Sequence, residues 1–193
     1  MQSNNIGRML KISGIGGFIL NAIATLVLYI YILMPIILQE TETRLRSMGI
    51  PVQQVRPELS IISSVTEVVV PITMLIIWLI QSAILYGLFW AFKIRPSFTN
   101  TWLVSGNYYY IATISTAITG FYLTTLIPHI TSPYTPQLLI IDLAFLIIGS
   151  IFLAYLFSKV YNTPFIKAFI PTLISLTILF IITTLPSLHT LQY

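Results

Sequence analysis

Five long apolar stretches dominate the sequence and decide what the chain can fold into. They run from about residue 14 to 38, 65 to 92, 102 to 127, 137 to 157 and 164 to 185. A helix needs about 20 apolar residues to cross the hydrocarbon core of a bilayer, and each stretch reaches that length. Only 7% of the residues are charged, whereas a soluble domain carries about 25%. The sequence therefore predicts an all-α, polytopic membrane protein with five transmembrane helices in a single domain, residues 1–193.

Helix-start signals support these boundaries. Ser64 and Glu67 have the spacing of a capping box, in which a hydroxyl and a carboxylate satisfy free backbone amides. Ser97 precedes the third stretch as a candidate cap, and a threonine followed by a proline stands before the fourth and fifth. Hydropathy and capping thus predict the same helix starts.

The only substantial polar segment is residues 39–63, which we expect to be an outer loop. Glu42 and Arg46 form an acid-then-base pair four residues apart, which favours a helix. The first helix is therefore expected to continue to about residue 48 and to stop at Gly49. The prolines that follow predict an extended chain for the rest of the loop.

The distribution of lysine and arginine predicts the orientation. With five crossings, one side carries Arg8, Lys11, Lys93, Arg95, Lys159 and Lys167, and the other carries Arg44, Arg46 and Arg56. Because cytoplasmic loops are enriched in positive residues, we expect the N-terminus in the cytoplasm and the C-terminus outside the cell membrane. Lys93, Arg95, Lys159 and Lys167 then form a cytoplasmic basic face that can contact anionic lipid or a protein partner.

An acidic residue inside a span is the sharpest candidate for chemistry. Asp142 lies in the fourth stretch, where a charge is costly and often functional. Glu67 and His129 fall on the same outer side, so the three predict a proton-linked or weak metal site. The alternative is structural: Glu67 caps a helix, and the Asp142 carboxylate is stabilised by the positive end of the helix dipole or pairs with Arg56.

Four polar residues within the spans are candidates for intramembrane contacts: Asn21, Gln81, Thr113 and Thr116. Such side chains usually bond a neighbouring helix, and the alternative is that they contact a substrate. Trp102 and the tyrosines at 108–110 are typical of an aromatic belt near the inner interface.

Sequence signals for catalysis, cofactors and nucleic acid are lacking. The chain has no cysteine, which removes thiol nucleophiles and thiolate metal sites. The glycines at 14, 16 and 17 open a membrane span instead of following a strand, so they fail as a dinucleotide fingerprint. The net charge of +4 is explained by positive residues at the membrane face. We predict no enzyme, no cofactor and no nucleic-acid partner.

The layout and several short motifs resemble the Yip family of Rab-interacting five-helix membrane proteins, and its prokaryotic branch most closely. The likeness is strongest over residues 78–110, and a weaker likeness covers residues 157–168. The motifs that carry it are Gln81, Tyr86-Gly87, Phe92, Ser97-Phe98 and Gly106 through Tyr108. The eukaryotic members' acidic-Leu-Tyr-Gly-Pro motif is missing, so the resemblance implies no GTPase binding.

What the resemblance implies is a non-catalytic membrane-organising or partner-binding scaffold, working with lipid, a protein partner or further copies of itself. A transporter or channel component is the second hypothesis, and it predicts a hydrated path lined by Gln81, Thr113, Thr116 and Asp142. An accessory subunit of a larger membrane complex is the third.

Overall fold

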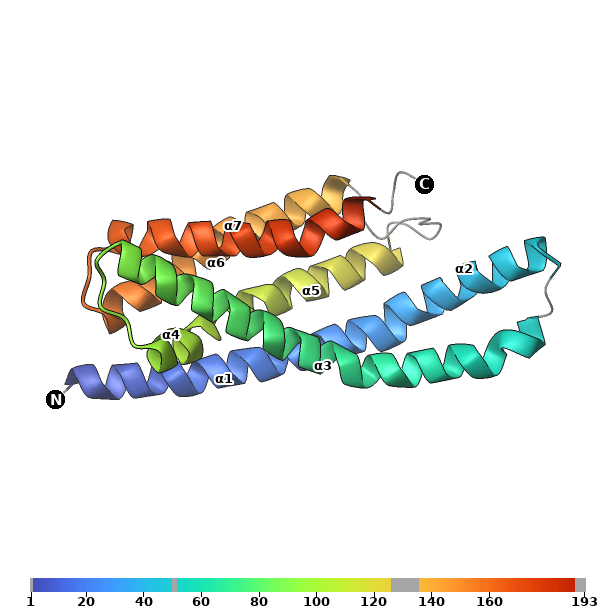
Figure 1. The fold of residues 1–193 in the computed structure, drawn as a ribbon, viewed down its shortest axis with the longest axis horizontal. Helices are drawn as coiled ribbons and strands as arrows, with labels where there is room; N and C mark the ends of the chain where they lie inside the picture. The colour runs from blue at the N-terminus through green and yellow to red at the C-terminus, as the bar shows by residue number, and fades with distance from the viewer. Residues whose placement is uncertain (1, 50–51, 126–135, 190–193) are drawn as a thin grey trace.

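The computed structural model describes residues 2–49, 52–125 and 136–189, and over these residues it contains helices and turns but no strand. The long helices lie roughly along the long axis of the molecule, and the chain begins at one end of that axis (Figure 1). The elements in order are α1 (Gln2–Leu28), the π-helix η1 (Tyr29–Leu33), α2 (Met34–Ser47), α3 (Val52–Ala91), α4 (Phe98–Ser105), α5 (Tyr108–Thr125), α6 (Pro136–Val160) and α7 (Phe165–His189).

Four helical segments in the described part of the chain are long and apolar enough to cross a membrane. They are Asn5–Ser47, Ser64–Ala91, Pro136–Val160 and Phe165–Thr183. The protein is therefore an all-helical chain with the composition of a multi-pass membrane protein. Helix α5 is shorter and more polar, with five threonines and four tyrosines in its 18 residues, and it packs against α1 and α6 within the bundle.

The first apolar stretch belongs to one continuous helix made of α1, η1 and α2. Where α1 passes into α2, the backbone N–H of Met34 bonds to the carbonyl of Tyr29, five residues earlier. Pro35 follows directly, and a proline ring clashes with the carbonyl four residues before it. The wider π-turn relieves that clash, so the helix bends and continues. Gly49, with a φ of +74°, follows the end of α2 at the predicted position.

The second stretch starts much earlier than expected. Residues 52–63 are helical and continuous with the rest of α3, so the prediction of an extended chain was wrong. Ser64 lies inside this helix and not at its start, so the capping-box prediction was wrong too. Pro57 is the sixth residue of α3, where a proline is normally unfavourable, so the local sequence does not explain the early start.

The third stretch is interrupted. We predicted one helix over residues 102–127, but α4 ends at Ser105 and α5 begins at Tyr108. The side chain of Asn107 stabilises the break, since its Nδ2 donates to the carbonyls of Val104, at 2.9 Å, and of Leu10, at 2.8 Å. The second bond also ties the break to α1.

Three glycines let α1 approach this break closely. A Cβ atom on Gly14 would overlap the backbone carbonyl of Leu103, and one on Gly106 would overlap the backbone of Gly14. A Cβ on Gly17 would lie 2.7 Å from the carbonyl of Gly106. Because packing rather than hydrophobicity drives helix association in lipid, such backbone contacts are a main source of stability there.

The hydrophobic core lies in the half of the bundle where α3 ends and α4 begins. Leu85, Phe89, Val104, Leu153 and Phe157 are fully buried there. The rings of Phe89 and Phe157 pack edge to face with centroids 4.8 Å apart. This core holds α3, α4 and α6 together.

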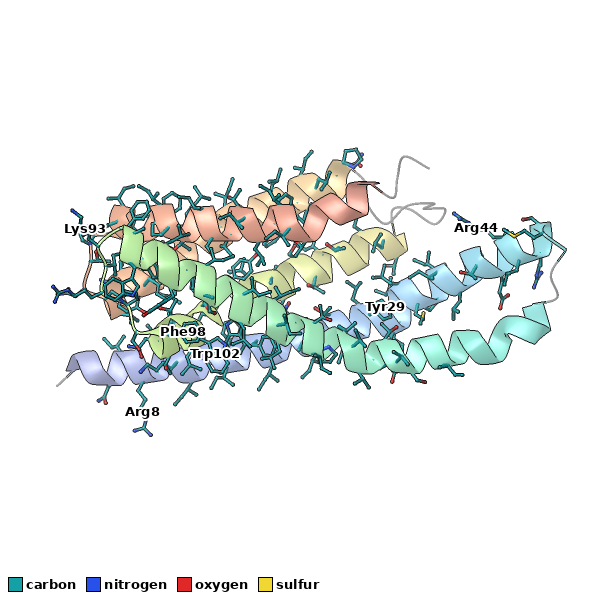
Figure 2. The ribbon with its side chains drawn as sticks, in the orientation of Figure 1. Arg8, Tyr29, Arg44, Lys93, Phe98 and Trp102 are labelled. Atoms are coloured by element: carbon teal, nitrogen blue, oxygen red, sulfur yellow. The ribbon has the colours of Figure 1, made fainter. Side chains whose placement is uncertain are left out.

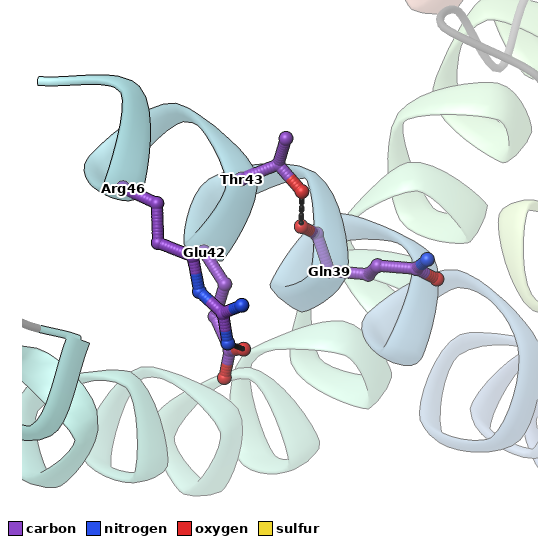
Figure 3. Close-up of polar contacts among 4 residues, drawn as sticks. All are labelled: Gln39, Glu42, Thr43 and Arg46. Carbon is purple, nitrogen blue, oxygen red and sulfur yellow. Dashed lines mark hydrogen bonds and ion pairs between the residues drawn. The ribbon is translucent and has the colours of Figure 1, made fainter.

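At the other end, α2 and residues 52–63 of α3, together called the hairpin, extend well beyond the ends of α5, α6 and α7 (Figure 1). Two side-chain contacts within α2 are local. Thr43 donates to the carbonyl of Gln39 at 2.8 Å, and Arg46 pairs with Glu42 at 3.7 Å (Figure 3). The hairpin therefore projects from the bundle with local contacts along α2.

Candidate functional site

The basic residues predicted for one side of the membrane do lie at one end of the molecule. Figure 2 shows Arg8 and Lys93 at this end and Arg44 at the opposite one. Lys159 is in the last turn of α6 and Lys167 in the first turn of α7, whose ends meet here. Arg95 lies exposed in the turn between α3 and α4. The predicted basic face is thus one contiguous end of the bundle.

Two tight turns give this basic end a defined shape. Lys93 and Asn162 both have a left-handed backbone, with φ of 57° and 46°. After each of them, an N–H bonds back to a carbonyl five residues earlier: Ile94 to Phe89 at 2.9 Å, and Thr163 to Ser158 at 3.1 Å. This pattern ends a helix sharply and satisfies its last carbonyls.

A tyrosine joins the two turns. The hydroxyl of Tyr161 lies 2.7 Å from Oγ1 of Thr101 and donates to the carbonyl of Ser97 at 3.3 Å. Burial raises the pKa of Tyr161 above its ordinary value, while these two hydrogen bonds act in the opposite direction. The phenol therefore stays neutral at physiological pH and acts as a structural link.

A polar and aromatic junction lies at the break between α4 and α5. Trp78 is only 3% exposed, and its Nε1 donates to Oγ of Ser105 at 2.9 Å and to the carbonyl of Trp102 at 3.1 Å. Ser82 lies 2.9 Å from Ser105, oxygen to oxygen. The ring of Phe18 stacks on that of Trp78 with centroids 4.5 Å apart. The junction connects α1, α3 and α4 without an acid, a base or a nucleophile activated by one.

The aromatic-belt prediction fails for one of its residues. Tyr109 is only 5% exposed and packs edge to face against Trp78 and Phe18, so it belongs to the junction and not to an interface. The sequence pattern did not separate the two cases, because clustered aromatic residues suit both.

Gln81 lies beside the junction and is fully buried. Its Oε1 accepts from the hydroxyl of Tyr109 at 3.5 Å, and its backbone carbonyl accepts from Ser175 at 3.4 Å. Its amide nitrogen has no hydrogen-bond partner among the described residues. Gln81 therefore connects α3 to α5 and α7 inside tight packing.

Asn21 and Thr113 meet between α1 and α5. The hydroxyl of Thr113 lies 3.4 Å from Oδ1 of Asn21 and also donates to the carbonyl of Tyr109 at 2.7 Å. Asn21 is buried. This pair is an interhelical contact of the kind that holds membrane bundles together.

Thr116 and Asp142 line a separate cavity of about 280 Å³ between α5, α6 and α7. Asp142 accepts a hydrogen bond from Oγ of Ser115 at 3.3 Å. Thr183 of α7 and Tyr108 of α5 also contribute polar atoms to the wall. This is where the fold places a carboxylate, hydroxyl groups and open space together.

Of the predicted cluster of Glu67, His129 and Asp142, the structure describes Glu67 and Asp142, and these two do not lie together. Glu67 is exposed on α3, whereas Asp142 faces the cavity, and His129 lies outside the described residues. Within the described ranges, no three His, Cys, Asp or Glu side chains gather in a way that could hold a metal ion.

Sequence analysis missed two residues that matter here. Ser82 is four residues after Trp78 and shares its helix face, but Ser105 lies 27 residues from Trp78, and no sequence pattern links those two. Ser115 lies one residue from Thr116, so the face of α5 that meets Asp142 could have been found from its run of hydroxyls at 113, 115 and 116.

Comparisons with protein-family models, with curated proteins and with solved structures find no match to this chain. The resemblance to the Yip family accordingly stays a prediction.

Proposed function

We propose that the chain is a five-span, non-catalytic membrane scaffold of Yip-like type whose basic end lies in the cytoplasm and whose hairpin binds a partner protein on the outer side. The observation that carries the proposal is the projection of the hairpin beyond the rest of the bundle. Helix α3, with 40 residues, is about 60 Å long at 1.5 Å per residue, roughly twice the hydrocarbon thickness. A scaffold needs such an element outside the lipid.

The count of five rests on α5 as a fifth span. Its 18 residues give a length of about 27 Å, close to the hydrocarbon thickness. Neighbours on two sides cover part of its polar surface, since it packs against α1 and α6. A helix shielded in this way tolerates more hydroxyl groups than one surrounded by lipid.

Orientation can be tested by cysteine labelling, because the natural chain has no cysteine. Thr43→Cys places a thiol on the hairpin, and Ser97→Cys places one in the turn between α3 and α4; both positions are exposed. With a membrane-impermeant maleimide on intact cells, we expect labelling of Thr43→Cys and not of Ser97→Cys until the cells are permeabilised. The reverse pattern would invert the proposed topology.

The basic face is tested by charge reversal. The double variant Lys93→Glu and Arg95→Glu should shift part of the population to an inverted or incomplete insertion, since positive residues retain a loop in the cytoplasm. The same labelling assay measures this shift. Unchanged labelling would mean that these two residues do not determine topology.

Partner binding is tested by photo-crosslinking in native membranes. A photoreactive residue at Arg46, on the hairpin, should give a protein adduct, and one at Ile148, an exposed apolar position of α6, should react with lipid. Equal yields of protein adducts at both positions would contradict the hairpin as the docking element. A partner that co-purifies in stoichiometric amount in mild detergent would identify the chain as an accessory subunit of a permanent complex.

The transporter hypothesis receives less support. It requires Gln81, Thr113, Thr116 and Asp142 to line one hydrated path. Gln81 and Thr113 are engaged in interhelical packing, and only Thr116 and Asp142 line the cavity.

A further inference from the structure

The cavity between α5, α6 and α7 has a use that the scaffold function does not require. We propose that it binds a small organic cation, an amine with a compact apolar or aromatic body, and that the carboxylate of Asp142 is its counter-ion. The proposal does not depend on the hairpin or on the number of spans.

The first argument is charge. Asp142 is half-buried within α6, and its hydrogen bond comes from a neutral hydroxyl, that of Ser115. Among the described residues that line the cavity there is no lysine, arginine or histidine, and Asp142 forms no ion pair with another described residue. A carboxylate at such depth is costly unless a cation accompanies it. A positively charged ligand supplies that partner.

The second argument is the shape and chemistry of the wall. A volume of about 280 Å³ lies at the lower limit of small-molecule sites. The hydroxyl of Ser115 lies 3.3 Å from the carboxylate of Asp142, and the wall includes the apolar side chains of Phe145, Leu176 and Phe180. An ammonium group suits the carboxylate and the hydroxyls, and an apolar body suits the aromatic and aliphatic side chains.

The same wall argues against an inorganic cation. Ca²⁺ and Mg²⁺ carry two charges and are bound mainly by carboxylate and carbonyl oxygens and by water, whereas the described wall offers one carboxylate and otherwise the hydroxyls of Tyr108, Ser115, Thr116 and Thr183. The apolar part of the cavity would also remain empty around a bare ion. An organic cation fills both parts.

The experiment uses the full-length protein in mild detergent, with phenethylamine as the probe and its neutral isostere 2-phenylethanol as the ligand control. Binding is measured by calorimetry. We expect phenethylamine to bind at least tenfold more tightly than 2-phenylethanol, and Asp142→Asn to weaken phenethylamine binding roughly tenfold or more, because a charge-assisted bond is lost. Glu67→Gln, which removes an exposed carboxylate from α3, is the matched control and should change the affinity less than twofold.

Equal affinity for the amine and the alcohol, or unchanged amine binding by Asp142→Asn, would overturn the proposal. A response to MgCl2 or CaCl2 with none to the amine would also overturn it in favour of a metal site. If Asp142→Asn does not fold, Thr116→Leu tests the cavity without changing its charge. The added volume should abolish phenethylamine binding, and retained binding would show that the probe binds elsewhere.

Discussion

The basic half of the bundle and the hairpin are built from the same kind of helix and are stabilised differently. In the basic half, Phe89 is fully buried against α6. In the hairpin region of the same helix, Ile61 is 62% exposed, and Thr41, Thr43 and Arg46 of α2 make contacts within the turns of their own helix. Helix α3 passes through both settings without a break. A helix thus forms in both the apolar and the polar part of the sequence, and only helix–helix contact makes a core.

The largest expected effect comes from deleting a core ring. Phe89→Ala should cost about 3 kcal/mol of stability because it leaves a cavity among packed side chains, whereas Ile61→Ala should cost under about 0.5 kcal/mol because that side chain is exposed. Unfolding by a denaturing detergent, followed by circular dichroism, measures both. Similar losses for the two variants would remove the distinction between core and hairpin.

Next in size is the close contact of α1 with the α4–α5 break. Gly14→Ala should cost about 1–3 kcal/mol, since the added methyl overlaps the Leu103 carbonyl and the backbones must separate. Gly87→Ala is the matched control: a Cβ there meets nothing within 4 Å, so the variant should gain about 0.5–1 kcal/mol from reduced chain freedom. The same unfolding assay applies. A neutral Gly14→Ala would mean that this contact is not tight in the membrane.

A smaller effect is expected at the polar junction. Ser105→Ala removes an acceptor of the Trp78 indole and a partner of Ser82, so a loss of about 1 kcal/mol is expected. Ser158→Ala, which removes only a bond to the carbonyl of Tyr155 three residues earlier, should be nearly neutral. Tryptophan fluorescence should change only in the first variant. Equal behaviour would show that the junction adds no stability beyond a local bond.

The smallest effect belongs to the hairpin surface. Glu42→Gln breaks the pair with Arg46, in which the arginine is 72% exposed, and pairs of this kind contribute about 0.3–0.5 kcal/mol. We expect the free energy of unfolding to change by no more than that, and the change to vanish in high salt because exposed charges are screened. A larger, salt-resistant loss would show that the hairpin is more tightly held than its contacts indicate.

The parts of the fold that depend on local composition were predictable. The apolar stretches, the stop after α2 at Gly49 and the common end of Lys93, Lys159 and Lys167 all follow from residue type and spacing. The break at Gly106 was not predictable, because it is stabilised by the hydrogen bond from Asn107 to the backbone of Leu10, far away in the chain. The helical start of α3 was missed because a proline is normally unfavourable inside a helix.

The candidate site was predictable in part for the same reason. Asp142 stood out as an acidic residue several residues inside an apolar stretch. Its neighbour Ser115 and the cavity between three helices arise from packing, so no linear pattern contains them. Glu67 was grouped with Asp142 because both were expected on the outer side of the membrane. Two residues on the same side of a membrane need not line the same cavity.

The π-turn at Tyr29–Leu33 has a consequence for the direction in which α2 faces. Such a turn holds one more residue than an α-turn, and one residue corresponds to about 100° of rotation about the helix axis. The wide turn absorbs that residue, so α2 keeps the phase it would have if the helix were one residue shorter and regular throughout. With the same residues and no π-turn, all of α2 would be rotated by about 100° relative to α1 and a different side of it would face α3. The orientation of the projecting arm is thus set within the first apolar stretch, by one wide turn beside Pro35.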